Sequence, residues 1–177
     1  MARDIQVLQF FSGEGTDSRG RLLKQVLNWS DDELERTHDF IQWLFPLAEP
    51  SGFNIHAPVL DDSTIQQFLA EDKFRQSLRA ALIRMLTFYG LEFLPGVPPR
   101  IIPGQRYAGR SRNWVTLGNH NHLRITRILK SLRLLGLEPE AAAFFDCLAD
   151  IYGDESVKTS PRISQETFNF WQSAAKN

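Results

Sequence analysis

Apolar residues recur at intervals of three and four along most of the chain, which is the spacing of one face of an α-helix. The first such stripe predicts a helix near 18–28 and consists of Leu22, Leu23, Val26 and Leu27. A second helix is expected from Asp31 to about Phe45, where Pro46 stops it. Helical periodicity therefore dominates the first quarter of the chain.

The expected start of the second helix carries a capping box. The hydroxyl of Ser30 can accept the amide proton of Glu33, whose carboxylate can reach back to Ser30. The inward stripe of this helix contains Leu34, His38, Ile41 and Phe45. We therefore expect His38 to be a hydrogen-bonded core residue, with Asp39 beside it in solvent.

Two more helices are expected after a loop. Residues 46–62 hold three prolines, a glycine and an asparagine and read as that loop. Ser63 is the expected cap of a short helix, with Gln66 at the capping-box position. A long helix near 71–89 follows, and Gly90 fits a left-handed residue at its C-terminal end.

Residues 92–113 change in character. Four prolines alternate with four arginines, and a connection of this length is uncommon in a compact domain unless it is functional or disordered. We expect a long Pro/Arg-rich loop here, and we expect residues 95–113 to be mobile without a partner.

Three further helices complete the prediction. One begins at Asn119 or Asn121 and ends at Gly136, the next starts near Pro139 and stops at Gly153, and Ser164 opens the last. The segment Ile5–Leu8 is a weak strand candidate. The sequence thus predicts an all-α protein, a single domain over 1–177 built as a bundle of six or seven helices.

Composition narrows the class of protein. Twenty basic against twenty-one acidic residues give a net charge of -1, so the global charge argues neither for nor against nucleic acid. A few local cations and an Arg-rich loop do not make a nucleic-acid protein at this total charge, so we do not expect nucleic acid as a partner. The single cysteine, Cys147, has apolar neighbours and is expected to be a buried small side chain. Neither a signal peptide nor a run long enough to span a membrane is visible, so we expect a cytoplasmic protein.

Several dense runs resemble one family. The segment Ile41–Leu47 and the later segment Leu123–Leu132 are similar to the conserved domain of the opioid growth factor receptor family, and the resemblance spans roughly 30–132. Other residues of the resemblance are Leu34, Glu35, His38, Glu49, Asn54, Ala57, Leu60, Phe68, Met85, Leu86, Phe88, Tyr89, Gly90, Trp114, His120 and Asn121.

The resemblance implies a binding function. Animal members of the family are described as binding a small opioid peptide, with nuclear-envelope or membrane association and a restraint on cell proliferation. A receptor-like module that reversibly binds a peptide or protein partner is the corresponding expectation for this chain. The resemblance names no cofactor, and the residues themselves call for none.

The candidate ligand-binding residues combine aromatic, imidazole and guanidinium groups. Spacings of three and four place Arg124 and Arg127 on one helix face with Ser131. Together with a polar helix start they would suit a phosphate or carboxylate. The complete candidate set is Trp43, Trp114, His120, His122, Arg124 and Arg127.

Simpler interpretations stand beside this set. The two histidines would then serve turn and capping roles, since metal binding would need a third ligand, and the arginines would form a solvated or salt-bridged face. Two other functions remain open. One is a nucleic-acid or nucleotide-binding module that uses Arg106, Arg110 and Arg112 as well. The other is a hydrolase using His38 or His120, although no catalytic motif is present.

Overall fold

The computed structural model describes residues 2–156, 158–159 and 161–176. These residues form ten α-helices and a two-stranded antiparallel sheet, which confirms the predominantly helical class. The chain divides into two compact units. The first unit comprises Met1–Arg84 with Leu134–Gly136, and the second comprises Met85–Arg133 with Leu137–Asn177.

The first unit is organised around a row of buried aromatic rings. Its helices are α1 (Ala2–Ser12), α2 (Leu23–Leu27), α3 (Asp31–Arg36), α4 (Ile41–Leu44), α5 (Asp62–Ala70) and the greater part of α6 (Asp72–Tyr89). Successive ring centroids lie 5.0–5.7 Å apart, mostly edge to face, along the row Trp43, Phe10, Phe11, Phe68 and Phe74. Such ring pairs add to the stability that burial alone provides.

The expected helix Asp31–Phe45 is broken in the middle. The predicted capping box of Ser30 and Glu33 is present, but α3 ends at Arg36 and α4 begins only at Ile41. His38 lies between the two helices and is exposed, so its expected core position is wrong. The reason is a tertiary ion pair, because Asp39 accepts hydrogen bonds from Arg19 Nε at 3.0 Å and Arg21 Nη1 at 2.9 Å.

Three further boundaries in the first unit differ from expectation. Residues Ile5–Leu8 belong to helix α1 and not to a strand. The helix expected near 18–28 is reduced to the five residues of α2. The cap of α5 is Asp61 and not Ser63, because the Asp61 carboxylate accepts the Thr64 amide proton at 2.7 Å. An ionised carboxylate at a helix N-terminus is a strong cap.

The Pro/Arg-rich segment contains regular elements, which corrects the long loop expected near 92–113. Strand β1 (Leu91–Leu94) pairs antiparallel with β2 (Arg100–Pro103), and helix α7 (Tyr107–Trp114) follows. Pro95, Pro98 and Pro99 lie in the connection between the strands, where a missing amide proton breaks no ladder bond. Arg110 packs inward, since it covers the Phe88 ring and its Nε donates to the Phe88 carbonyl at 2.7 Å.

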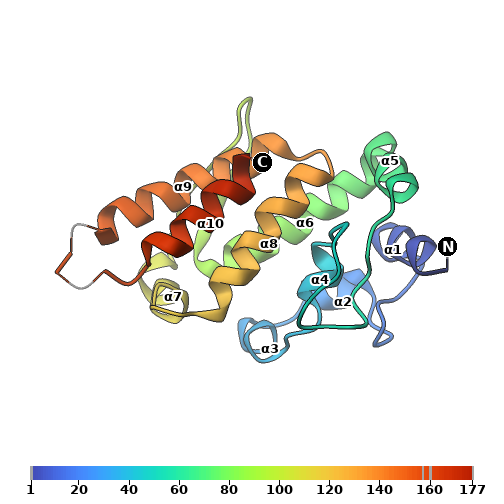
Figure 1. The fold of residues 1–177 in the computed structure, drawn as a ribbon, viewed down its shortest axis with the longest axis horizontal. Helices are drawn as coiled ribbons and strands as arrows, with labels where there is room; N and C mark the ends of the chain where they lie inside the picture. The colour runs from blue at the N-terminus through green and yellow to red at the C-terminus, as the bar shows by residue number, and fades with distance from the viewer. Residues whose placement is uncertain (1, 157, 160, 177) are drawn as a thin grey trace. The chain divides into compact units, whose positions relative to one another are not determined.

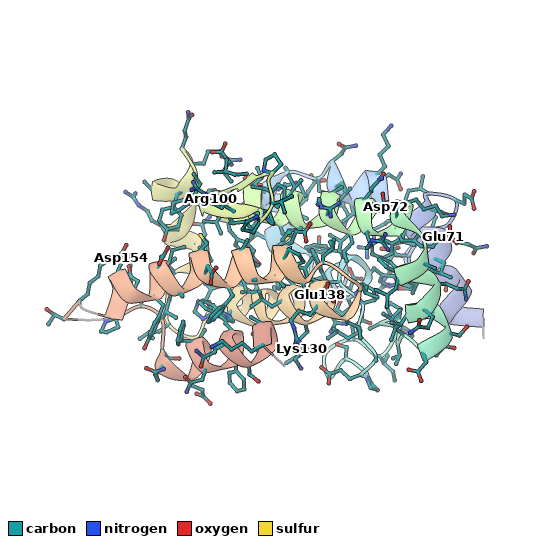
Figure 2. All side chains as sticks on the ribbon, turned by 90° about the horizontal axis from the view of Figure 1, so that it is seen from above. Glu71, Asp72, Arg100, Lys130, Glu138 and Asp154 are labelled. Atoms are coloured by element: carbon teal, nitrogen blue, oxygen red, sulfur yellow. The ribbon has the colours of Figure 1, made fainter. Side chains whose placement is uncertain are left out.

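The remaining helices of the second unit are α8 (His120–Leu134, with Leu134 itself assigned to the first unit), α9 (Glu138–Ser156) and α10 (Gln165–Lys176). Figure 1 shows α8, α9 and α10 side by side, and Glu138 and Asp154 mark the two ends of α9 in Figure 2. Helix α9 runs past Gly153, the residue expected to end it. The cap of α10 is as predicted, because Ser164 Oγ accepts the Thr167 amide proton.

Gly90 should be irreplaceable at the end of α6. Its φ is +82°, and a Cβ would lie 2.8 Å from the Cα of Tyr107 and 2.9 Å from the Cβ of Arg110. Gly90→Ala should therefore destabilise the protein by ~2 kcal/mol or more, measured by urea unfolding. Gly109→Ala is the matched control, because a Cβ there meets nothing within 4 Å. This control should leave stability unchanged or raise it by up to ~1 kcal/mol. Equal losses in both variants would contradict the close approach.

Candidate functional site

The six candidate binding residues belong to different units. Trp43 lies in the first unit, and Trp114, His120, His122, Arg124 and Arg127 lie in the second.

In the second unit, aromatic and imidazole groups join three segments through backbone carbonyls. Trp114 Nε1 donates to the Tyr89 carbonyl at 3.0 Å, and Trp171 Nε1 donates to the His122 carbonyl at 3.1 Å. His122 Nε2 lies 2.8 Å from the Trp114 carbonyl, which can only accept, so Nε2 carries the proton. This network links the end of α6 to α7, α8 and α10. Trp114 and His122 therefore have a structural role in the second unit.

The two histidines at the start of α8 lie in different environments. His120 is exposed whereas His122 is buried, because residues two apart on a helix point in different directions. Burial of the ring lowers the pKa of His122, and the charge of His120 lowers it further. The hydrogen bond to the Trp114 carbonyl raises the pKa but does not cancel these effects. No cluster of three His, Cys, Asp or Glu side chains in the described part of the chain could hold a metal ion.

The arginine face of α8 is more buried than its spacing suggests. Arg124 is only 5% exposed, and its Nη1 donates to Asn121 Oδ1 at 3.2 Å. Ser131 is fully buried and Arg127 is half-buried. Arg124 is thus hydrogen-bonded within the second unit, as Arg110 is to the Phe88 carbonyl. Two of the five arginines proposed for a nucleic-acid surface are therefore engaged inside the second unit.

Trp43 in the first unit has a different environment. It is 2% exposed, and its ring meets Phe10 edge to face at 5.5 Å. Its Nε1 is buried, and no hydrogen-bond acceptor for it is found among the described residues. Trp43 lines a cavity of about 70 Å³ together with Gln6, Ser18, His56 and Pro58. We call this cavity the Trp43 pocket.

Local hydrogen bonds hold two other walls of the Trp43 pocket in place. The buried Asp17 carboxylate accepts the backbone amide protons of Arg19 at 2.8 Å and Arg21 at 3.0 Å, so the turn that carries Ser18 is fixed. On the other side, Asn54 Oδ1 accepts the His56 amide proton at 2.9 Å. The pocket is therefore largely formed before any ligand arrives.

A surface loop adjoins the pocket. Leu47 and Val59 form an isolated β-bridge, and the Leu60 amide donates to the Leu47 carbonyl at 2.9 Å. The segment between them, the 47–59 loop, is thus closed at its base like an Ω-loop, a class that is often functional. At its tip Phe53 and Ile55 are 86% and 84% exposed. Residues between Pro50 and Val59 line a hollow of about 650 Å³.

The sequence interpretation missed this loop as a site. Residues 46–62 were expected to be a loop, and they are, but no binding role follows from that expectation. A usable signal was present in Gly52-Phe53-Asn54-Ile55, where two large apolar residues stand between turn-forming residues and outside any periodic stripe.

Two side expectations can be compared with the structure. Cys147 is buried as predicted, and burial raises the pKa of its thiol to about 12, so it stays protonated at neutral pH. None of the described helices combines the length and the apolar character that a membrane crossing requires.

The described residues form a predominantly helical protein in which the Trp43 pocket adjoins an exposed apolar loop. Residues 2–177 match the family model described as the opioid growth factor receptor conserved region, and the chain belongs to this family. The family recognised from residues 30–132 is thereby confirmed, and the match extends over nearly the whole chain.

Curated relatives bear the same family name. The mouse opioid growth factor receptor is 40% identical over 139 residues, which cover 76% of this chain and 22% of that protein. The mouse opioid growth factor receptor-like protein 1 is 37% identical over 183 residues, which cover 95% of this chain and 36% of that protein. The chain therefore spans a minor part of each relative. No solved structure matches it.

The buried imidazole of His122 should make the protein sensitive to mild acid. Its pKa lies below the ordinary value of about 6.5, so the unfolded chain takes up its proton first. The stability from the neutral ring is complete above pH 6.5 and declines as the pH falls toward the folded-state pKa. Urea unfolding at pH 7.5 and 5.5 should show a smaller loss for His122→Gln than for the wild type. The exposed His38 provides the control, and His38→Gln should keep the wild-type loss. An unchanged loss in His122→Gln would contradict this assignment.

Proposed function

We propose that this chain is a non-enzymatic binding module that takes up a peptide or protein partner on the 47–59 loop. The observation that carries the proposal is the exposure of Phe53 and Ile55 at the tip of a loop whose base is closed. Large apolar side chains that project singly from a surface are ordinary, but two of them beside a hollow of about 650 Å³ favour a recognition surface. The receptor names of the relatives agree with a binding role.

Restraint of the loop supports recognition. The Leu47–Val59 bridge closes the base, and Asn54 Nδ2 reaches Gln42 Oε1 on α4 at 3.5 Å. The buried Ala57 and Pro58 anchor the returning limb in the core. A loop held in this way loses little conformational entropy when a partner binds, so more of the contact energy contributes to affinity.

The candidate catalytic groups favour binding over catalysis. The two candidate bases, His38 and His120, are exposed and belong to different units. The pKa of the only cysteine thiol is raised, which disfavours a nucleophilic thiolate. The hydrolase therefore stays an alternative without a supporting observation.

We propose the Trp43 pocket, rather than Arg124 and Arg127, as the place where polar groups of the partner are recognised.

The proposal can be tested with a displayed random-peptide library selected on the wild-type protein. Burying an exposed Phe or Ile side chain contributes ~1.5–3 kcal/mol. The double variant Phe53→Ser/Ile55→Ser should therefore raise the dissociation constant of the selected peptides by about tenfold or more in fluorescence polarisation.

The matched control removes two exposed apolar side chains from the second unit. Leu123 and Phe170 are 57% and 55% exposed, and Leu123→Ser/Phe170→Ser should bind the selected peptides like the wild type. Circular dichroism melts check that both double variants remain folded. Unchanged binding by the loop variant, or a loss confined to the control variant, would refute the 47–59 loop as the recognition surface.

A further inference from the structure

The indole N–H of Trp43 is a donor in a fixed position for which the described residues offer no acceptor. The aromatic contact with Phe10 and the burial of the whole ring leave the side chain little freedom to turn away. A buried donor that makes no hydrogen bond costs ~1–3 kcal/mol, and folded proteins rarely keep one. By contrast, Trp114 and Trp171 each donate to a backbone carbonyl. The Trp43 N–H therefore needs an acceptor from outside the described residues, such as a ligand.

The Trp43 pocket has the size and the chemistry for a small acceptor group. A water molecule needs ~10–15 Å³ of such space. The cavity of about 70 Å³ thus has room for a group of several heavy atoms. Gln6, Ser18, Trp43 and His56 are among the residues that line it, and the side chain of each carries a hydrogen-bond donor. None of these lining residues is acidic.

We propose that the Trp43 pocket binds a carboxylate of the partner, with Trp43 Nε1–H as the buried donor. This inference rests on the proposed function, since it names the polar group that accompanies apolar contacts on the 47–59 loop. The connection is direct, because His56 and Pro58 belong to the returning limb of that loop and also line the pocket. A ligand could thus contact the loop with its apolar part and insert its carboxylate beside Trp43.

Other small occupants fit the donor set less well. A carboxylate only accepts hydrogen bonds and carries charge, so its bonds to several donors are stronger than those of a neutral carbonyl. A phosphate is usually held by arginine, lysine or a helix N-terminus, and neither Arg nor Lys is among the described side chains that line the pocket. Water could fill the space, but it would not respond to the type of solute added.

Nitrogen-15 NMR of the wild-type protein offers the direct test, because each of the four tryptophans gives its own indole N–H resonance. Sodium acetate should move the Trp43 resonance saturably, while acetamide and sodium chloride at matched concentration and ionic strength should not. Trp43→Phe keeps an aromatic ring and removes the donor, so it should weaken acetate binding about tenfold, read on the Ser18 backbone amide. Ser18→Ala, a change at an exposed residue, is the second variant in case Trp43→Phe does not fold. It should weaken acetate binding less than Trp43→Phe.

Three small probes then separate the two sources of a carboxylate. N-acetylleucine carries a terminal carboxylate, N-acetylleucinamide carries none, and the α-amide of N-acetylaspartate carries a side-chain carboxylate. Binding of the first alone assigns a peptide C-terminus, and binding of the third as well assigns any accessible carboxylate. An acetate response that is absent, non-saturable or equalled by acetamide would overturn the proposal.

The carboxylate proposal and the proposed function can fail separately. The loop variant Phe53→Ser/Ile55→Ser should retain the acetate response of Trp43, because neither residue lines the Trp43 pocket. If selected peptides lose affinity for the loop variant while acetate leaves Trp43 unmoved, the recognition surface stands and the carboxylate site falls. If acetate shifts the Trp43 resonance while the loop variant binds the selected peptides as tightly as the wild type, the carboxylate site stands and the recognition surface falls.

Discussion

The indole N–H of a buried tryptophan is removed from water together with its ring, so it needs an acceptor inside the protein or from a ligand. This requirement orders the second unit, where Trp114 and Trp171 satisfy it with the carbonyls of Tyr89 and His122. These bonds connect segments far apart in the chain. In the first unit the ring of Trp43 joins an aromatic row while its N–H lacks an acceptor among the described residues. The same residue type thus serves architecture in one unit and marks a candidate site in the other.

The candidate site depends on ordinary local structure. A turn around the Asp17 carboxylate positions Ser18, an Asn54 side chain positions the backbone of His56, and the aromatic row positions Trp43. Each of these arrangements is short-range or lies within one unit. Polar residues that the sequence made prominent, such as Arg124 and His122, are instead bonded inside the second unit. A dense polar motif therefore indicated packing, whereas the less prominent 47–59 loop carries the exposed apolar side chains Phe53 and Ile55.

Three features that depend only on neighbours in the chain were predicted correctly. The capping box at Ser30, the left-handed Gly90 and the cap at Ser164 each involve residues within three or four positions, and all are present. Features that depend on distant residues were not. The stripe through His38 favoured one long helix, but the ion pairs of Asp39 with Arg19 and Arg21 interrupt it. Likewise, the contact of Arg110 with Phe88 could not be read from a Pro/Arg-rich composition. The missing acceptor of Trp43 is a property of three-dimensional packing and has no sequence signature.

The closure of the 47–59 loop separates the demands of folding from those of recognition. Because Leu47 and Val59 pair at the base and Ala57, Pro58 and Leu60 are buried, the core interacts with the two limbs and hardly with the tip. Loop-closure entropy changes slowly with length, so residues between Pro50 and Phe53 can be exchanged or inserted at small thermodynamic cost, whereas Asn54 is needed for its bonds to His56 and Gln42. The tip therefore behaves as an exchangeable cassette. Relatives could diverge in partner choice there while keeping one scaffold, and a designer could graft new binding sequences at the same place.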